Sequence, residues 1–129
     1  ENRGLEVSYS GVFGATELAA SLTLQDPTDA DTGERLLRRS ATLASASVWQ
    51  TIGAWRLGAQ WAYVGPRSDV GDAHLAGYSL VDLLAQWDIG QGAQLFGRIE
   101  NLFNADYESV AGYNTASLSG FIGLRWKFQ

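Results

Sequence analysis

The chain has 129 residues, enough for one domain, and its net charge of −5 argues against nucleic-acid binding because phosphate contacts require clustered Lys and Arg. Hydrophobic residues make up 46% of the chain and charged residues 18%, and no stretch reaches the about 18 uncharged apolar residues that a membrane-spanning helix needs. Fifteen Gly, two Pro and five residues each of Trp, Tyr and Phe favour β-structure over helix.

Seven segments alternate apolar and polar residues, the pattern typical of β-strands, in which successive side chains point to opposite faces. They are Arg3–Phe13, Glu17–Gln25, Arg39–Gln50, Ala54–Val64, Tyr78–Ile89, Ala93–Phe103 and the last thirteen residues, Ser117–Gln129. The third segment is small and polar, so its facing is ambiguous. Most segments have about 9–12 residues, which matches the about 9–11 that a tilted strand needs to cross a bilayer.

The last segment has the most informative pattern. One parity is apolar and ends in Trp126 and Phe128, whereas the other carries Arg125 and Lys127. Aromatic residues at the edge of an apolar row are typical of membrane-spanning barrel strands, where they lie at the lipid–water interface. The pattern predicts an all-β, antiparallel up-and-down meander of about seven transmembrane strands.

The connections alternate in length along the chain. Short turns are expected at 14–16, 51–53 and 90–92, and long polar loops at 26–35, 65–77 and 104–116. Outer-membrane barrels have short periplasmic turns at one end and longer extracellular loops at the other, so the C-terminus is expected in the periplasm. A soluble β-sandwich or lipocalin-like barrel is the alternative, because chance could also sort six connections.

The polar parity carries charges that would cost about 2–4 kcal/mol each if they faced lipid at mid-depth. We therefore expect a lumen-facing polar wall that includes Arg56, Asp82, Arg98, Glu100, Arg125 and Lys127. These residues either form a hydrated wall with cross-strand ion pairs or contact a plug or a passing solute. Arg98 and Arg125 could jointly hold a carboxylate, although Glu100 is an equally near partner.

Catalytic and metal chemistry find little support. His74 is the only histidine and the chain has no Cys, so neither a catalytic residue, a metal site nor a cofactor is expected. The acidic loop around Asp29 and Asp31 resembles a calcium loop, but its glycine comes one position early and the distal Glu is missing. A flexible acidic loop is the favoured interpretation, and a loosely held surface calcium ion is the alternative.

Three stretches resemble the TonB-dependent outer-membrane receptors. R-G-L-E-V at 3–7 is similar to the opening of a strand in that family, and R-I-E-N-L-F-N-A-D-Y-E at 98–108 resembles its near-C-terminal Asn-Leu-Phe motif. The terminal strand ending in Trp126 and Phe128 resembles its barrel-assembly signal, with Gln129 as a departure. Within the family the chain looks most like the vitamin B12 (cobalamin) receptor branch, and a siderophore or heme receptor is the alternative.

The resemblance implies the C-terminal part of a barrel of about 22 strands around a plug. It also implies uptake of a scarce small-molecule ligand, such as cobalamin or a siderophore, with energy delivered through the TonB system. Plug, TonB box and earlier strands have no counterpart in the sequence, which opens at Glu1 without Met, so we expect a processed chain or a fragment that cannot transport alone. Its two open strand edges would have to pair elsewhere.

Ligand contacts are expected from the long loops. Tyr113, Asn114 and Tyr107 in the last loop are the best candidates, because aromatic and amide groups suit the rim of a corrinoid or a siderophore. Arg67 and Asp69 in the preceding loop are weaker candidates. For Tyr107 the alternative is an anchoring role at the end of the strand.

Overall fold

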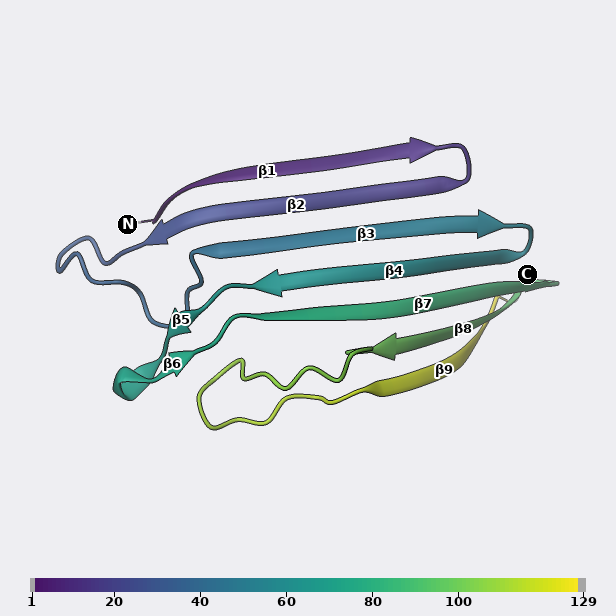
Figure 1. Cartoon of the computed structure of the whole chain (residues 1–129). Helices are drawn as coiled ribbons and strands as arrows, with labels where there is room; N and C mark the ends of the chain where they lie inside the picture. The colour runs from purple at the N-terminus through teal and green to yellow at the C-terminus, as the bar shows by residue number, and fades with distance from the viewer. Residues whose placement is uncertain (1, 128–129) are drawn as a thin grey trace.

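The computed structural model, which describes residues 2–127, folds the chain into a seven-stranded antiparallel sheet (Figure 1). The strands lie in the order β1-β2-β3-β4-β7-β8-β9, so each long strand pairs with the next one along the chain. They are β1 (Asn2–Phe13), β2 (Thr16–Pro27), β3 (Thr42–Ile52), β4 (Trp55–Val64), β7 (Tyr78–Gly90), β8 (Ala93–Glu100) and β9 (Ser119–Trp126). The expected seven-stranded antiparallel meander is confirmed.

A small substructure interrupts the loop between β4 and β7. It consists of β5 (Arg67–Ser68), the short 3₁₀ helix η1 (Val70–Asp72) and β6 (His74–Leu75), with β5 and β6 paired in an antiparallel ribbon. Within residues 2–127, no helix has the length and apolar composition to cross a bilayer.

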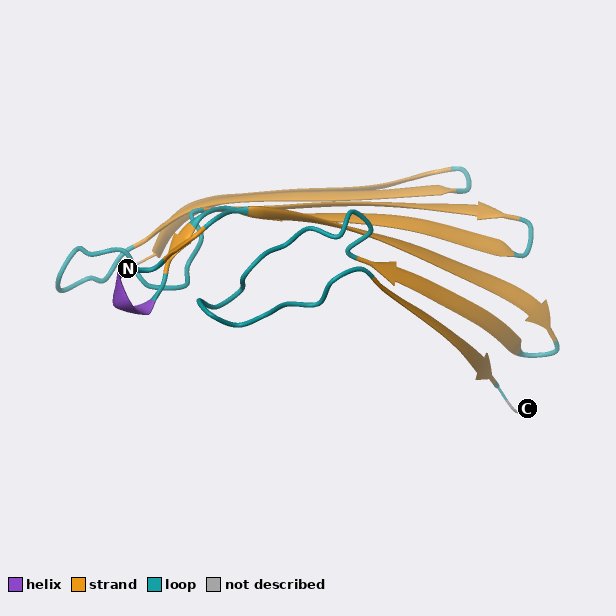
Figure 2. Ribbon diagram, turned by 60° about the horizontal axis from the view of Figure 1, so that its bottom comes forward, coloured by secondary structure: helices purple, strands orange, loops and turns teal. Residues whose placement is uncertain are grey.

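The connections are sorted by end, as the alternation of their lengths predicts. Figures 1 and 2 show the tight turns at one end of the sheet and the three long loops at the other. Gly14 and Gly53 begin two of the turns with φ values of 61° and 58°, the conformation required at the first central position of a type II′ hairpin turn. The N-terminus lies at the long-loop end and β9 runs toward the short-turn end.

The strand register collects apolar side chains from all seven strands on one face. Val7 lies opposite Leu22, Trp61 opposite Val81, and Leu95 opposite Leu124. Among the residues described, only Leu75 and Ala93 are buried hydrophobic residues, and the only other sheet is the short β5-β6 ribbon. Removing a large apolar side chain from water is worth about 1.5–3 kcal/mol, so this face requires a lipid environment.

The exposure of this face excludes the soluble alternative. The side chain of Ile122 is 78% exposed, and neither a second sheet nor a helix covers the face in the part of the chain that the structure describes. A sandwich or lipocalin-like barrel would bury these rows in a packed core. The chain does not.

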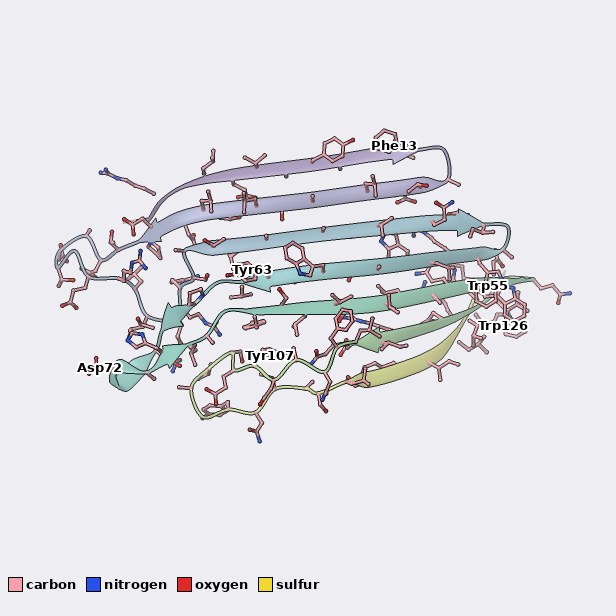
Figure 3. The ribbon with its side chains drawn as sticks, in the orientation of Figure 1. Phe13, Trp55, Tyr63, Asp72, Tyr107 and Trp126 are labelled. Atoms are coloured by element: carbon pink, nitrogen blue, oxygen red, sulfur yellow. The ribbon has the colours of Figure 1, made fainter. Side chains whose placement is uncertain are left out.

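Aromatic residues stand at both ends of the apolar face (Figure 3). At the short-turn end the Trp55 and Trp87 rings stack with centroids 5.2 Å apart, and Phe13 and Trp126 lie at the same end. Tyr63 lies toward the long-loop end of β4, eight residues from Trp55. At about 3.3 Å per residue, Trp55 and Tyr63 are about 26 Å apart along the strand, close to the about 25 Å height of an outer-membrane apolar band.

Several strand bounds differ from the sequence prediction. The sixth predicted strand continued to Phe103, but β8 ends at Glu100 because Asn101 adopts a φ of 50° that leaves the strand conformation. Phe103 therefore lies in the loop and does not continue the lipid-facing row. The third strand begins at Thr42 and not at Arg39. Phe128, part of the predicted assembly signal, lies outside the described residues.

Candidate functional site

The polar face opposite the lipid-facing rows carries the predicted wall. Arg56 lies opposite Gln86, Asp82 opposite Gln60, and Arg98 opposite Leu84, so these charged side chains share one face of the sheet. Glu100 and Arg125 belong to the same face, and Lys127 follows directly after β9. We call this surface the polar wall.

Ion pairs join charged side chains of the polar wall, both within a strand and between strands. Nη2 of Arg56 reaches the two carboxylate oxygens of Glu17 at 3.1 and 2.9 Å across β3, and its guanidinium lies 4.5 Å from the Trp49 ring centroid. Arg98 binds Asp82 at 3.0 Å and Glu100 at 2.9 Å. Arg98 thus has two carboxylate partners within the sheet, whereas Arg125 donates to Gln94 at 3.3 Å.

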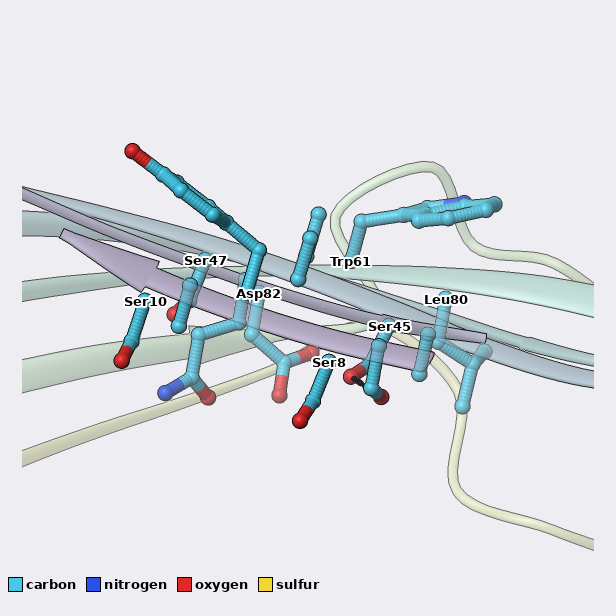
Figure 4. A pocket seen from close by; sticks show the side chains of 14 residues that line it. Ser8, Ser10, Ser45, Ser47, Trp61, Leu80 and Asp82 are labelled. Atoms are coloured by element: carbon cyan, nitrogen blue, oxygen red, sulfur yellow. Dashed lines mark hydrogen bonds between the residues drawn. The ribbon is translucent and has the colours of Figure 1, made fainter. Parts of the chain in front are cut away.

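The middle of the polar wall is hollowed by small side chains. Figure 4 shows the serines and Asp82 on one side of the sheet, with Trp61 on the other. Ser21 and Ser45 are hydrogen-bonded at 2.8 Å. The hollow has a volume of about 640 Å³, and its polar lining residues are Ser8, Ser10, Ser21, Ser45, Ser47, Gln60 and Asp82. Such a surface lets a neighbouring polar segment approach the sheet backbone closely.

At the long-loop end, Asp69 connects all three long loops. Its side chain is 1% exposed, and Oδ1 accepts hydrogen bonds from Nε of Arg38 at 2.6 Å and from the N–H of Val70 at 2.7 Å. Oδ2 accepts a third bond from the N–H of Ala111 at 2.8 Å. Arg38 belongs to the loop before β3 and Ala111 to the loop before β9, so one carboxylate joins three separate segments. We call this cluster the Asp69 hub.

The hub strongly favours the charged form of Asp69. Hydrogen bonds from the N–H of Ala111, from the side chain of Arg38 and from the N–H of Val70 lower the pKa of Asp69 from 3.8 to about 2. Burial opposes this shift, but the hydrogen bonds outweigh it. Asp69 is therefore ionised at neutral pH, and its role is to hold the loops together.

A second set of contacts joins the loop between β4 and β7 to the loop between β8 and β9. Nη2 of Arg67 donates to the backbone carbonyls of Glu108 and Ser109 at 2.8 and 2.9 Å, and its guanidinium lies 5.5 Å from the Tyr78 ring centroid. The Tyr78 and Tyr107 rings are in turn 4.4 Å apart. Arg67 and Tyr107 thus lie in one chain of contacts that supports the last loop.

The Asn-Leu-Phe motif is a clamp at the base of the last loop. Asn101 is 4% exposed, and its Nδ2 donates to the carbonyls of Ala105 and Ala116 at 2.9 and 3.2 Å. Its Oδ1 accepts from the N–H of Ala105 at 2.8 Å. Asn104 Oδ1 accepts from the N–H of Leu118 at 2.9 Å. The two asparagines close the loop by binding both of its arms.

The predicted ligand residues fall into two groups. Arg67 and Tyr107 are half-buried and meet through Tyr78, whereas Tyr113 is 69% exposed and Asn114 is also exposed, both at the far end of the last loop. The structure therefore does not bring the four together, and ligand contact by any of them stays a prediction. Sequence analysis ranked Asp69 as a weak ligand candidate and missed its structural role, because no local pattern indicates partners 31 and 42 residues away.

Neither His74 nor the acidic loop forms a metal site in the residues described. His74 is exposed and borders a hollow of about 330 Å³ with Tyr78, Asp106 and Tyr107. Asp29 Oδ1 accepts from the N–H groups of Asp31 and Thr32, so this carboxylate closes a turn. Within residues 2–127, no three His, Asp or Glu side chains come together in a way that could hold a metal ion.

Comparison with known proteins gives a family match for most of the chain. Residues 1–102 match the family described as TonB dependent receptor-like, beta-barrel. The chain is 28% identical over 130 residues to the vitamin B12 transporter BtuB of Photobacterium profundum, covering 99% of this chain and 22% of that protein. It is 27% identical over 138 residues to the same transporter of Vibrio cholerae. The chain thus spans about a fifth of the length of these relatives.

Solved structures of larger proteins contain a similar sheet. The pyoverdine-bound FpvA of Pseudomonas aeruginosa superposes with a TM-score of 0.83 at 18% identity, covering 98% of this chain and 19% of that one. The FrpB iron transporter of Neisseria meningitidis superposes with a TM-score of 0.78 at 17% identity, covering 98% and 24%. At these identities the likeness establishes the fold alone.

Proposed function

Because the chain belongs to the TonB-dependent receptor-like β-barrel family, we propose that it forms the C-terminal seven strands of an outer-membrane receptor for active transport. The plug and the earlier barrel strands would come from segments outside this sequence. The single observation that carries the proposal is the exposed apolar face with aromatic residues at both ends, opposite a polar wall. The family consists of transporters and not of enzymes, in agreement with the expectation from sequence.

Cobalamin is the ligand that we propose first. Its support is the similarity to vitamin B12 transporters over 99% of the chain. A ferric siderophore or another metal chelate is the second candidate, because the iron transporter FrpB and the pyoverdine-bound FpvA share the fold. Both candidates are large ligands that a receptor would first contact through its outer loops.

Within the receptor, the three long loops face the outside and the C-terminus lies in the periplasm. The orientation follows from the general rule that outer-membrane barrels carry their longer loops outside. Tyr113 and Asn114 then make the first ligand contacts from the exposed tip of the last loop, while Arg67 and Tyr107 hold that loop in place. The polar wall faces the plug and the water-filled interior.

Energy for transport would reach the plug from the TonB system, so the seven strands alone do not transport. The sheet leaves one edge of β1 and one edge of β9 without a strand partner among the residues described. Each unpaired backbone group in lipid costs several kcal/mol. We therefore expect these edges to pair with the remaining barrel strands of the receptor.

Ligand binding by a receptor that contains this chain tests the proposal. Radiolabelled cyanocobalamin is added to outer membranes from cells that lack their own cobalamin receptor, with ferric pyoverdine as competitor. We expect saturable cyanocobalamin binding that ferric pyoverdine does not reduce. Saturable binding of ferric pyoverdine without cyanocobalamin would instead support the second candidate.

Two tyrosine variants locate the contact. Tyr113→Ala removes an exposed ring at the loop tip, whereas Tyr9→Ala removes an exposed ring on the lipid-facing side of β1. We expect the first change to weaken cyanocobalamin binding and the second to leave it unchanged. Equal binding by both variants would remove Tyr113 from the site.

A further inference from the structure

Two phenylalanine rings interrupt the polar wall near β9. Phe96 lies opposite Gly123, and Phe121 lies opposite Arg98, so both rings project from the polar face. The side chain of Phe121 is 57% exposed. A surface that only contacts water gains nothing from exposed phenyl rings, and clustered exposed apolar groups commonly mark binding sites.

The rings border a hollow of about 410 Å³, a volume within the about 300–1,000 Å³ typical of small-molecule sites. Arg98, Arg125 and Glu100 also line it, together with the amide side chains of Gln86 and Gln94. The lining therefore combines a flat apolar surface with charged groups and hydrogen-bonding amides.

The Phe96 ring is held in place by the backbone beside it. A Cβ on Gly123 would collide with this ring, which means that the ring lies directly against the β9 backbone. The guanidinium of Arg125, two residues further along β9, lies 5.7 Å from the ring centroid. Gly123 thus positions the ring, and the ring in turn contacts the cation.

Arg125 is the cation of this hollow whose charge is not compensated. Arg98 is bound by Asp82 and Glu100, whereas the only side-chain hydrogen bond of Arg125 within residues 2–127 is the 3.3 Å contact with the neutral Gln94.

The carboxylate of Asp88, on β7, does not compensate the charge of Arg125. Asp88 lies opposite Gln94 on the far side of β8, and its Oδ1 accepts the N–H of Gly90 at 2.9 Å. Among the residues described, no ion pair joins Asp88 to Arg125. Most of the guanidinium donors of Arg125 are therefore free to bind an anion.

We propose that Phe96, Phe121 and Arg125 form a site for a small organic acid whose carboxylate is attached to an aromatic or apolar body. Arg125 binds the carboxylate, the rings pack against the body, and the amide of Gln86 is available to the remaining oxygens. The inference rests on the proposed function in one respect, namely that this face borders the water-filled interior.

Binding of 4-fluorobenzoate to a purified receptor that contains this chain, in nonionic micelles, tests the site by ¹⁹F NMR, with neutral 4-fluorobenzamide as the matched probe. Arg125→Gln removes the cation, Arg125→Lys keeps its charge, and Lys127→Gln is the control because Lys127 does not line the hollow. Circular dichroism verifies that each variant keeps its β-structure.

We expect 4-fluorobenzoate to bind and 4-fluorobenzamide to bind at least about tenfold more weakly. Arg125→Gln should lower the affinity for 4-fluorobenzoate by a similar factor. Arg125→Lys should retain more affinity than Arg125→Gln, and Lys127→Gln should match the parent chain. The proposal is overturned if the parent does not bind the acid, if the acid and the amide bind equally, or if Lys127→Gln loses as much affinity as Arg125→Gln. Cyanocobalamin binding at the outer loops is an independent readout, so failure of this site leaves the transport role intact.

Discussion

Arg38 donates a 2.6 Å hydrogen bond from Nε to the buried Oδ1 of Asp69, across 31 residues of sequence. The same carboxylate binds the N–H of Ala111, 42 residues further on. One side chain therefore decides how the three long loops are arranged at the end of the sheet where we place the ligand. The loop tip that carries Tyr113 depends on this arrangement.

Asp69→Asn is expected to release the last loop. An amide keeps one acceptor but places an N–H₂ group where Oδ1 or Oδ2 now accepts hydrogen bonds, so at least one donor among Arg38, Val70 and Ala111 loses its partner. We expect limited proteolysis within 105–117 to become about tenfold faster or more. Asp72→Asn is the matched control, because Asp72 is exposed and its φ of 61° suits asparagine equally well. Unchanged cleavage in Asp69→Asn would show that the hub does not hold the loop.

The hub should also respond to acid, in a range set by Asp69. Its pKa is lowered from 3.8 to about 2, chiefly by the N–H of Ala111, so the charged form is the one that the folded loops favour. The stabilisation is fully present above pH 3.8 and is lost as the pH falls through about 2. Pepsin cleavage of the last loop should therefore be slow at pH 4 and accelerate toward pH 2, relative to Asp69→Asn. A constant ratio between the two chains over this range would contradict the assignment.

The two asparagines of the Asn-Leu-Phe motif should tolerate a carboxylate very differently. Asn101→Asp replaces the N–H₂ group that donates to Ala105 and Ala116 and leaves a buried charge facing their carbonyl oxygens. Asn104→Asp keeps the oxygen that accepts from Leu118. We expect the first change to cost about 3 kcal/mol in free energy of unfolding and the second less than about 1 kcal/mol. Thermal unfolding in micelles measures both, and equal costs would contradict the clamp.

Gly58, in the middle of β4, is expected to be sensitive to any added side chain. A Cβ at this position would lie 2.6–2.8 Å from atoms of the Trp49 ring, which is also covered by Arg56. We expect Gly58→Ala to destabilise the sheet by about 1–3 kcal/mol and to shift the tryptophan emission. Gly97→Ala is the control, because the nearest atom to its Cβ would be the Phe121 carbonyl oxygen at an ordinary 3.6 Å. A stable Gly58→Ala chain would mean that the ring can move aside.

Alternation within each strand made most of the fold predictable, because side-chain direction in a strand depends only on parity. Leu57 and Arg56 were assigned to opposite faces from sequence, and the register confirms the separation. The end of β8 was not predictable, since Leu102 and Phe103 extend the apolar pattern while Asn101 turns the chain out of the strand. The turn is stabilised by hydrogen bonds from the Asn101 side chain to carbonyl groups of the loop. The alternation of apolar and polar residues carries no information about these bonds.

The loop contacts were beyond sequence reasoning for a similar reason. Asp69 looked like one acidic residue among several in its loop, and only the fold shows that it alone is buried between three segments. Phe121 was also unassigned, because its neighbours Gly120 and Ile122 face the opposite side. Only the structure shows that Phe121 lines a hollow together with Arg98 and Phe96 of β8.

Solvent accessibility along β2 in a bilayer tests most directly whether lipid contacts the apolar face. The chain has no Cys, so single spin labels can be attached after Leu22→Cys and Ser21→Cys, at adjacent residues on opposite faces. We predict that the label at position 22 is relaxed by oxygen, which concentrates in lipid, and that the label at position 21 is relaxed by a water-soluble nickel chelate. A label at position 22 that reaches the nickel chelate, or that is shielded from both reagents, would contradict the conclusion that lipid contacts the apolar face.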